Sequence, residues 1–187
     1  MKKLPIIESY WVKEGQLLAG EYPGSFEAET TRRRMDAFLE AGITTFINLT
    51  EPNELPPYES ILKEEANIYG VNTSHLRFTI RDYSIPSSNT MTTILNTIDS
   101  AMDDGRCVYV HCWGGVGRTG LVVGCYLVRH GHTNEQALMQ VDTLFKTRPS
   151  RAFHLRSPES DEQVNFILNW WEDPSLFYKN NQKFCEG

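Results

Sequence analysis

Ten residues near the middle of the chain constrain its fold more strongly than any other segment. Residues 111–120 read HCWGGVGRTG and lie between an apolar run at 107–110 and a second apolar run at 121–128. This order predicts a strand, a tight glycine loop and a helix. Backbone N–H groups converge at the start of such a helix, where the helix dipole adds partial positive charge. The segment therefore predicts an anion-binding loop, and phosphate is the natural ligand.

Two side chains make this loop a candidate site of phosphoryl transfer. Cys112 lies where the N–H groups converge, and the field that binds an anion also favours a thiolate, which can attack phosphorus and form a cysteinyl phosphate. Arg118 can hold two phosphoryl oxygens with one planar guanidinium. Thr119 places a hydroxyl where it can donate a hydrogen bond to the departing sulfur. The predicted phosphate-binding residues are Trp113, Gly114, Gly115, Val116, Gly117 and Arg118.

The Cys-x5-Arg-Thr/Ser-Gly pattern resembles the phosphate loop of the cysteine-dependent protein tyrosine phosphatase superfamily, and within it the small dual-specificity phosphatases. The resemblance covers roughly residues 10–172. It implies a phosphomonoester hydrolase, and specifically a protein phosphatase that acts on phosphotyrosine and on phosphoserine or phosphothreonine. A chain of this length lacks a recognisable tyrosine-recognition loop, so the resemblance implies a shallow pocket that admits all three phosphorylated residues.

Two alternatives remain open at this point. The same chemistry could act on an inositol phosphate, a phosphoinositide or an RNA 5′-triphosphate. Trp113 and Val116 stand where phosphoinositide phosphatases of the superfamily carry lysines, which counts against that alternative without removing it. The second alternative is a pseudophosphatase that only binds phosphopeptides. The presence of a cysteine, an arginine and a candidate acid disfavours it.

Asp82 is the predicted general acid. The departing alkoxide or phenoxide needs a proton, which a carboxylic acid on a loop above the cradle can supply before it acts as base on water in the second step. Asp82 directly follows an extended segment, in the loop at 81–87. The resemblance implies a general acid about thirty residues before the nucleophile, and Asp82 matches that spacing. Glu51 and Glu54, in the loop after another predicted strand, are rival candidates.

Several residues are candidates for supporting roles. By its position in the family, His111 is implied to be a structural histidine that bonds the backbone and favours the thiolate. Gln163 resembles the glutamine that positions water in some family members, although an exposed helical glutamine is an equal alternative. Asn48 is a candidate hydrogen-bond partner of the loop. The other histidines lack metal-ligand spacing, so we predict no metal and no cofactor; these histidines are His75, His130, His132 and His154.

Three arginines and two tryptophans precede the C-terminal tail. Arg148, Arg151 and Arg156 lie between the last two predicted helices, where they either attract anionic substrate or form a solvated face. Trp170 and Trp171 are expected to cover the core.

The order of the predicted elements indicates one α/β domain over residues 1–187, with a core at about 10–172 and a tail at 173–187, and the resemblance implies that it is a phosphatase domain. We expect a mainly parallel central sheet with helices on both faces, and a ligand site at the carboxyl ends of its strands. The expected strands are 17–24, 43–49, 71–80 and 107–110. The expected helices are 31–40, 57–69 and 88–102, with others starting at 118, after a capping box at 133–136, and at Ser157 as N-cap with Pro158.

Composition limits the partners that we expect. The 187 residues carry a net charge of −6, with a pI of about 5.4, which argues against a nucleic-acid partner. No apolar run has the length of a signal peptide or a membrane span, so we expect a cytoplasmic protein whose partner is a phosphorylated protein or a small phosphomonoester. The sequence does not predict the oligomeric state.

Cys107 and Cys125 lie too far from Cys112 for a disulfide and are expected to be buried thiols, whereas Cys185 lies in the tail.

Overall fold

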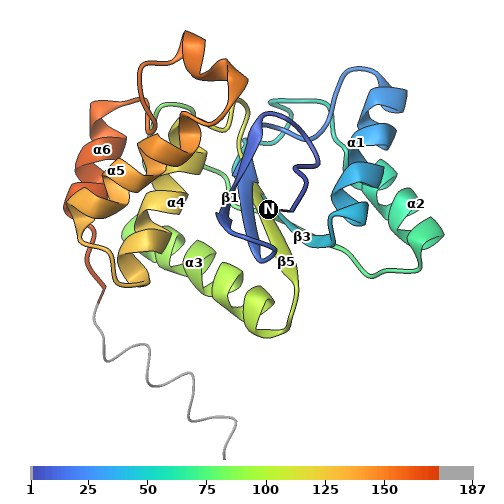
Figure 1. Ribbon diagram of the computed structural model, residues 1–187, viewed down its shortest axis with the longest axis horizontal. Helices are drawn as coiled ribbons and strands as arrows, with labels where there is room; N and C mark the ends of the chain where they lie inside the picture. The colour runs from blue at the N-terminus through green and yellow to red at the C-terminus, as the bar shows by residue number, and fades with distance from the viewer. Residues whose placement is uncertain (1, 173–187) are drawn as a thin grey trace, which may run out of the picture.

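A five-stranded sheet forms the centre of the protein (Figure 1). The computed structural model describes residues 2–172, apart from the side chains of residues 150 and 151. The strand order is β1-β2-β5-β3-β4, in which β1 pairs antiparallel with β2 and all other pairs are parallel. The predicted mainly parallel sheet is therefore confirmed. The strands are β1 (Ser9–Lys13), β2 (Leu17–Gly20), β3 (Ile43–Asn48), β4 (Ser74–Arg77) and β5 (Cys107–His111).

Helices cover both faces of this sheet, as expected (Figure 1). On one face lie α1 (Ala28–Glu40) and α2 (Glu59–Tyr69). The other face carries α3 (Ser88–Asp103), α4 (Gly117–Arg129), α5 (Asn134–Phe145) and α6 (Asp161–Leu168). A short 3₁₀ helix, η1 (Pro149–Phe153), lies between α5 and α6.

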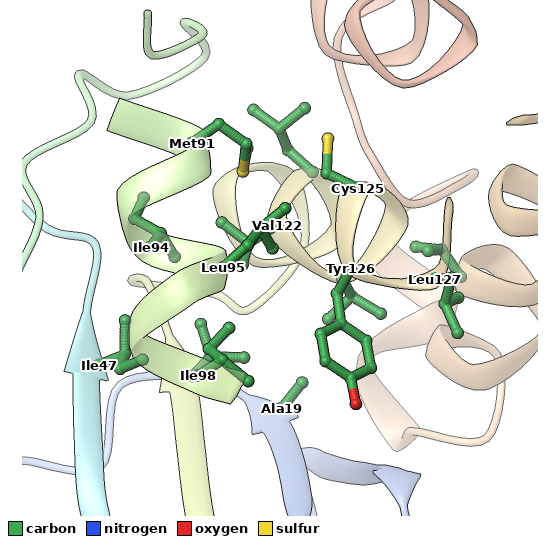
Figure 2. Close-up of a cluster of buried hydrophobic side chains, with 14 of the residues drawn as sticks. Ala19, Ile47, Met91, Ile94, Leu95, Ile98, Val122, Cys125, Tyr126 and Leu127 are labelled. Atoms are coloured by element: carbon green, nitrogen blue, oxygen red, sulfur yellow. The ribbon is translucent and has the colours of Figure 1, made fainter. Parts of the chain in front are cut away.

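The central strand β5 explains why the core has two halves. Successive side chains of a strand point to opposite faces, so Val108 and Val110 pack under α3 and α4, while Tyr109 packs against Phe38 of α1. Figure 2 shows the first half, in which apolar residues of α3 meet those of α4 above β2 and β3. The labelled side chains are Ala19, Ile47, Met91, Ile94, Leu95, Ile98, Val122, Cys125, Tyr126 and Leu127. Because β5 is buried on both faces, the loop that follows it has a rigid base.

Two local expectations were wrong. The antiparallel strand β1 was not expected. The last helix begins at Asp161 with Ser160 as its N-cap, rather than at Ser157. The Ser157 hydroxyl instead donates to the Val116 carbonyl at 2.7 Å. The capping box predicted at Thr133 and Gln136 is confirmed.

The cysteines, the helix lengths and the two C-terminal tryptophans can be compared with the expectations from the sequence. Cys107, Cys112 and Cys125 are buried and free, as expected, whereas Cys185 and the predicted tail lie outside the described part of the chain. Between residues 2 and 172, no helix combines the length and the apolar character needed to cross a membrane. Trp170 is buried, but Trp171 is exposed, so only the first of the two covers the core.

Candidate active site

Three loops meet where the parallel strands end. The glycine loop joins β5 to α4 (Figure 1). The loop after β3 lies beside it, with the Leu49 N–H donating to the His111 carbonyl at 2.9 Å. The segment after β4 joins the same edge, because the Ile80 N–H donates to the Leu49 carbonyl at 3.1 Å. These backbone bonds bring Glu54 and Asp82 to the glycine loop, as strand order in a parallel sheet requires.

Arg118 is the buried cation around which the acids gather. Its guanidinium donates two hydrogen bonds to Glu54, at 2.6 and 2.8 Å, and one to the Ile80 carbonyl at 3.2 Å. Nη2 also lies 3.1 Å from Oδ1 of Asp82. Nε, which is buried as well, has no hydrogen-bond partner among the described residues. An unpaired buried donor of this kind is the group that a phosphoryl oxygen would satisfy.

The ion pair between Arg118 and Glu54 keeps both side chains charged. Burial alone would lower the pKa of Arg118, but the Glu54 carboxylate and the nearby Cys112 and Asp82 raise it above its usual value. Burial alone would raise the pKa of Glu54, yet the hydrogen bonds from Arg118 and from the Glu51 N–H hold it below its usual range. Glu54 is therefore an ionised partner that orients Arg118. A carboxylate held in this way makes a poor proton donor at neutral pH.

Cys112 lies at the base of the loop and is 3% exposed. The hydroxyl of Thr119 is also buried and has no hydrogen-bond partner within the described residues. Trp113, at 55% exposure, lies at the mouth, where it lines a pocket of about 230 Å³ together with Tyr22 and Phe26. The loop thus has a buried reactive end and an open, partly aromatic end.

Carbonyls of the glycine loop are held from outside. Arg148 donates to the Gly114 and Gly115 carbonyls, each at 2.8 Å. The Tyr22 N–H donates to the Trp113 carbonyl at 2.7 Å, and Ser157 holds that of Val116. Because these carbonyls are bound outside the loop, they do not compete with its N–H groups for the interior, although the Gly117 N–H already bonds Glu159.

Gly115 has two reasons to be glycine. Its φ is +67°, in the left-handed region that side chains disfavour. A Cβ built there would also overlap the Gly20 backbone at the end of β2. The loop can therefore lie against β2 only with glycine at this position.

Arg148, Arg151 and Arg156 were expected either to attract anionic substrate or to form a solvated face. They do not share one role. Arg148 is 1% exposed and also pairs with Glu8, at 3.1 Å, so it is neither solvated nor available to attract substrate. Arg156 is exposed and pairs with Asp161. The side chain of Arg151 lies outside the described residues.

His111 has the geometry of a structural histidine. Its Nδ1 lies 3.3 Å from the Cys112 carbonyl, which can only accept, so Nδ1 carries the proton and Nε2 accepts from the Tyr58 hydroxyl at 2.7 Å. Burial lowers the pKa of His111 to about 3, so the ring is neutral at physiological pH. Burial also raises the pKa of Tyr58 far above its usual value, which keeps the hydroxyl protonated. Nothing in the sequence near either residue predicts this pair.

Asn48 and Gln163 make other bonds than those expected. The Asn48 carbonyl oxygen accepts from Thr50, from its N–H at 2.9 Å and from its hydroxyl at 2.7 Å, so Asn48 shapes the loop after β3. Gln163 is buried rather than exposed. Its Oε1 accepts from the Ser160 N–H at 3.3 Å, and its Nε2 donates to the Ser84 carbonyl at 3.2 Å.

Glu159 is a site residue that the sequence interpretation missed. A Cβ built on Gly117 would overlap its Oε1, which places the carboxylate against the last glycine of the loop. Its pKa is raised, first by burial and then by the charge of Asp82. Across residues 2–172, no cluster of three or more histidine, cysteine or acidic side chains has the geometry to hold a metal ion.

A comparison with known families agrees with this geometry. The family model described as "Swiss Army Knife protein, DSP-PTPase phosphatase domain" matches residues 8–167. The chain belongs to this family. Fold and family together make the matched residues a phosphatase domain of the protein tyrosine phosphatase type, as the glycine loop predicted.

Similar proteins differ in their described activities. The mouse protein tyrosine phosphatase domain-containing protein 1 is 34% identical over 134 residues, 65% of this chain but only 17% of the mouse protein. An Arabidopsis thaliana phosphatidylglycerophosphate phosphatase, PTPMT1, is 33% identical over 99 residues, 52% of this chain and 28% of its own length. This chain therefore spans a small part of these relatives.

Solved structures give the same fold. Tk-PTP in its active form has a TM-score of 0.64 at 25% identity and covers 86% of this chain and 95% of its own. A kinase associated phosphatase reaches a TM-score of 0.66 at 15% identity, with 96% of each chain covered.

Proposed function

We propose that the protein is a protein phosphatase that hydrolyses phosphotyrosine and phosphoserine or phosphothreonine through a cysteinyl-phosphate intermediate. In the first step, the Cys112 thiolate attacks phosphorus and Asp82 protonates the departing oxygen. Arg118 donates to a phosphoryl oxygen through its unpaired Nε. In the second step, the Asp82 carboxylate takes a proton from water, the water oxygen bonds to phosphorus, and the S–P bond breaks to return the Cys112 thiolate, which Thr119 stabilises.

One observation carries the choice of substrate. Arg118 is the only charged side chain of the loop at 112–118; the carboxylates of Glu54 and Asp82 contact it, and that of Glu159 lies against Gly117. A polyphosphorylated inositol or an RNA 5′-triphosphate would bring further phosphates toward these carboxylates. A peptide with a single phosphate avoids that repulsion.

A lipid with one phosphate is the second candidate. The Arabidopsis relative is described as a phosphatidylglycerophosphate phosphatase, and a PTPMT1 structure holds PI(5)P. In this chain, Trp113 and Phe26 are exposed beside the loop and could contact an apolar group. The acidic surroundings of Arg118 are compatible with one phosphate in either case, so the two candidates differ in what carries it.

Free buried thiols support a reducing compartment, and the cytoplasm is the location that we propose.

Substitution of Cys112 tests the reaction type. In Cys112→Ser, activity on an aryl phosphate should fall below about a hundredth of wild type, because a serine hydroxyl is not ionised at neutral pH. Affinity for inorganic phosphate should persist, since the cradle is made of backbone. Cys107→Ser, which alters a buried cysteine on β5 away from the loop, is the matched control and should retain activity. Retained activity in Cys112→Ser would contradict the mechanism, and an inactive wild-type protein would favour the pseudophosphatase.

A substrate panel tests the specificity. It compares kcat/KM for phosphotyrosine and phosphoserine peptides, phosphatidylglycerophosphate, phosphoinositides, inositol polyphosphates and an RNA 5′-triphosphate. We expect the peptides to give the highest value. A higher value for phosphatidylglycerophosphate in vesicles would favour the lipid candidate, and a higher value for inositol polyphosphates would contradict the charge argument.

A further inference from the structure

The turn that carries Asp82 has a backbone conformation that its own sequence does not favour. The Ser84 N–H donates to the Arg81 carbonyl at 3.1 Å, so Asp82 and Tyr83 are the central residues of a tight turn. Tyr83 has a φ of +59°, in the left-handed region that glycine adopts readily and that a bulky side chain disfavours. Such a conformation persists only where surrounding contacts hold it. The contacts of this turn therefore decide where the Asp82 carboxylate lies.

The start of α6 supplies those contacts. The Ser160 hydroxyl donates to the Tyr83 carbonyl at 3.2 Å, and Nε2 of Gln163 donates to the Ser84 carbonyl at 3.2 Å. The N-cap and the first turn of α6 thus hold the two carbonyls that follow Asp82. The Tyr83 side chain is 61% exposed, so it contributes little to fixing the turn itself.

Ser160 and Gln163 are also fixed by each other. The Gln163 N–H donates to the Ser160 hydroxyl oxygen at 3.2 Å, and the Ser160 N–H donates to Oε1 of Gln163 at 3.3 Å, which together form the capping box of α6. Both polar atoms of the Gln163 side chain are therefore engaged within the protein. Freeing this side chain to orient water would sacrifice two hydrogen bonds in a buried setting.

Gln163 lies against the phosphate loop as well. A Cβ built on Gly117 would come within 2.9 Å of Oε1 and 3.1 Å of Nε2 of Gln163. One buried side chain therefore fills the space between Gly117, which directly precedes Arg118, and the carbonyl of Ser84. Because Ser84 is only two residues beyond Asp82, this side chain sets how the acid lies relative to the phosphate loop.

We propose that Ser160 and Gln163 are positioning residues that hold the Asp82 turn over the phosphate loop, where its carboxyl group can reach the leaving-group oxygen. This inference rests on the proton-transfer role proposed above for Asp82. It gives Gln163 a different role from the positioning of water. In both steps the proton moves at Asp82, and neither Ser160 nor Gln163 gains or loses one.

Gln163→Met and Ser160→Gly test the assignment without adding charge. Methionine fills space without the hydrogen bonds of glutamine, and glycine is tolerated at an N-cap. With a phosphotyrosine peptide, whose leaving group needs a proton, we expect each variant to lower kcat/KM about tenfold or more. With an aryl phosphate of an acidic phenol, which departs unaided, kcat/KM should change by less than about threefold. Ser160→Thr keeps the hydroxyl and should restore the wild-type value for the peptide.

A double-mutant cycle tests whether the two side chains act through the acid. In an Asp82→Asn background, addition of Gln163→Met should lower kcat/KM for the peptide by less than about twofold, because the group that it positions is already absent. Gln136→Met is the matched control. It breaks the equivalent capping box of α5, which starts at Thr133, and should leave kcat/KM unchanged for both substrates.

Several outcomes would overturn the proposal. Equal losses on both substrates, or full additivity with Asp82→Asn, would show that these contacts support the fold or the phosphate loop rather than the acid. Unchanged kcat/KM for the peptide in both variants would also reject it. If Gln163→Met fails to fold, Ser160→Gly carries the test, with Ser160→Thr as its rescue. Failure of the proposed function looks different, because wild type would then be inactive on every phosphomonoester or Cys112→Ser would remain active.

Discussion

The contacts of Arg118 distinguish between the acidic residues that the sequence left as candidates for the general acid. Glu54 binds it with both carboxylate oxygens and is only 12% exposed, while Asp82 makes a single contact and is more open to solvent. Glu51 takes part through its N–H, which donates to Glu54 at 2.8 Å. A residue that is locked to the arginine orients it, whereas a more open residue can reach the substrate oxygen. The geometry thus favours Asp82 as the proton donor.

Asp82→Asn should slow turnover in proportion to the leaving group's need for a proton. For a phosphotyrosine or phosphoserine peptide, we expect kcat to fall about 10²–10⁴-fold. For an aryl phosphate with an acidic phenol, the loss should be much smaller, because that phenol departs unaided. The measurement is a plot of log kcat against leaving-group pKa for both enzymes. Glu54→Gln provides the contrast, since a disoriented Arg118 should slow every substrate similarly. An unchanged slope in Asp82→Asn would remove the proton-donor role from this residue.

The site residues that the sequence predicted are those that belong to a short sequence pattern or directly follow a predicted strand. Cys112 and Arg118 belong to one short pattern, and Asp82 directly follows a predicted strand. The contacts of Tyr58 with His111 and of Arg148 with Gly115 could not be predicted in this way, because the partners are 53 and 33 residues apart. Their partners are set by how strands and helices pack, and neither residue carries a motif of its own.

Among the elements, the glycine loop depends on a side chain that follows α5. The charged side chain of Arg148 is only 1% exposed, and Glu8 and two loop carbonyls compensate its charge. The cost of burying the guanidinium is offset only while these partners are in place. The loop after α5 therefore fixes the shape of the phosphate cradle without contributing to its interior.

Arg148→Met should weaken both the fold and the cradle. Removal of one partner from a buried charge pair costs about 3–5 kcal/mol, so the free energy of unfolding should fall by that order. In the protein that stays folded, vanadate should bind at least about tenfold more weakly, because the Gly114 and Gly115 carbonyls lose their donors. Denaturant unfolding and vanadate inhibition measure the two effects. Arg33→Met, at an exposed position of α1, should change neither. Unaltered vanadate affinity in Arg148→Met would show that the loop keeps its shape unaided.

The boundaries of the last helix show where element prediction from sequence stops. Ser157 with Pro158 and Ser160 with Gln163 both match helix-start patterns. Only the packed structure decides between them, since the Ser157 hydroxyl is used by the Val116 carbonyl and Ser160 is free to cap α6. The longer helices were predictable because their apolar spacing spans several turns.

Across the whole molecule, a neutral histidine inside an aromatic cluster couples folding to pH. His111 is fully buried between the sheet and the α1–α2 layer, in contact with Tyr22, Tyr58 and Tyr109. Its pKa is about 3 in the fold, against 6.5 for an unperturbed histidine. Below pH 6.5 the unfolded chain binds a proton that the folded chain does not, so stability rises with pH in this range. The contribution of His111 is complete above pH 6.5 and is lost as the pH falls toward 3.

His111→Asn should remove this part of the pH dependence. Between pH 7.5 and pH 5, wild type should lose about 2 kcal/mol of unfolding free energy through His111, at about 1.4 kcal/mol per pH unit below 6.5. The variant is expected to be less stable at pH 7.5, because Tyr58 loses its partner, but its decline toward pH 5 should be shallower by that amount. Urea unfolding at the two pH values measures the difference, and His132→Asn, at an exposed position, should decline as wild type does. Parallel declines in wild type and His111→Asn would mean that the folded protein admits the proton, and that the buried ring is not held neutral by its surroundings.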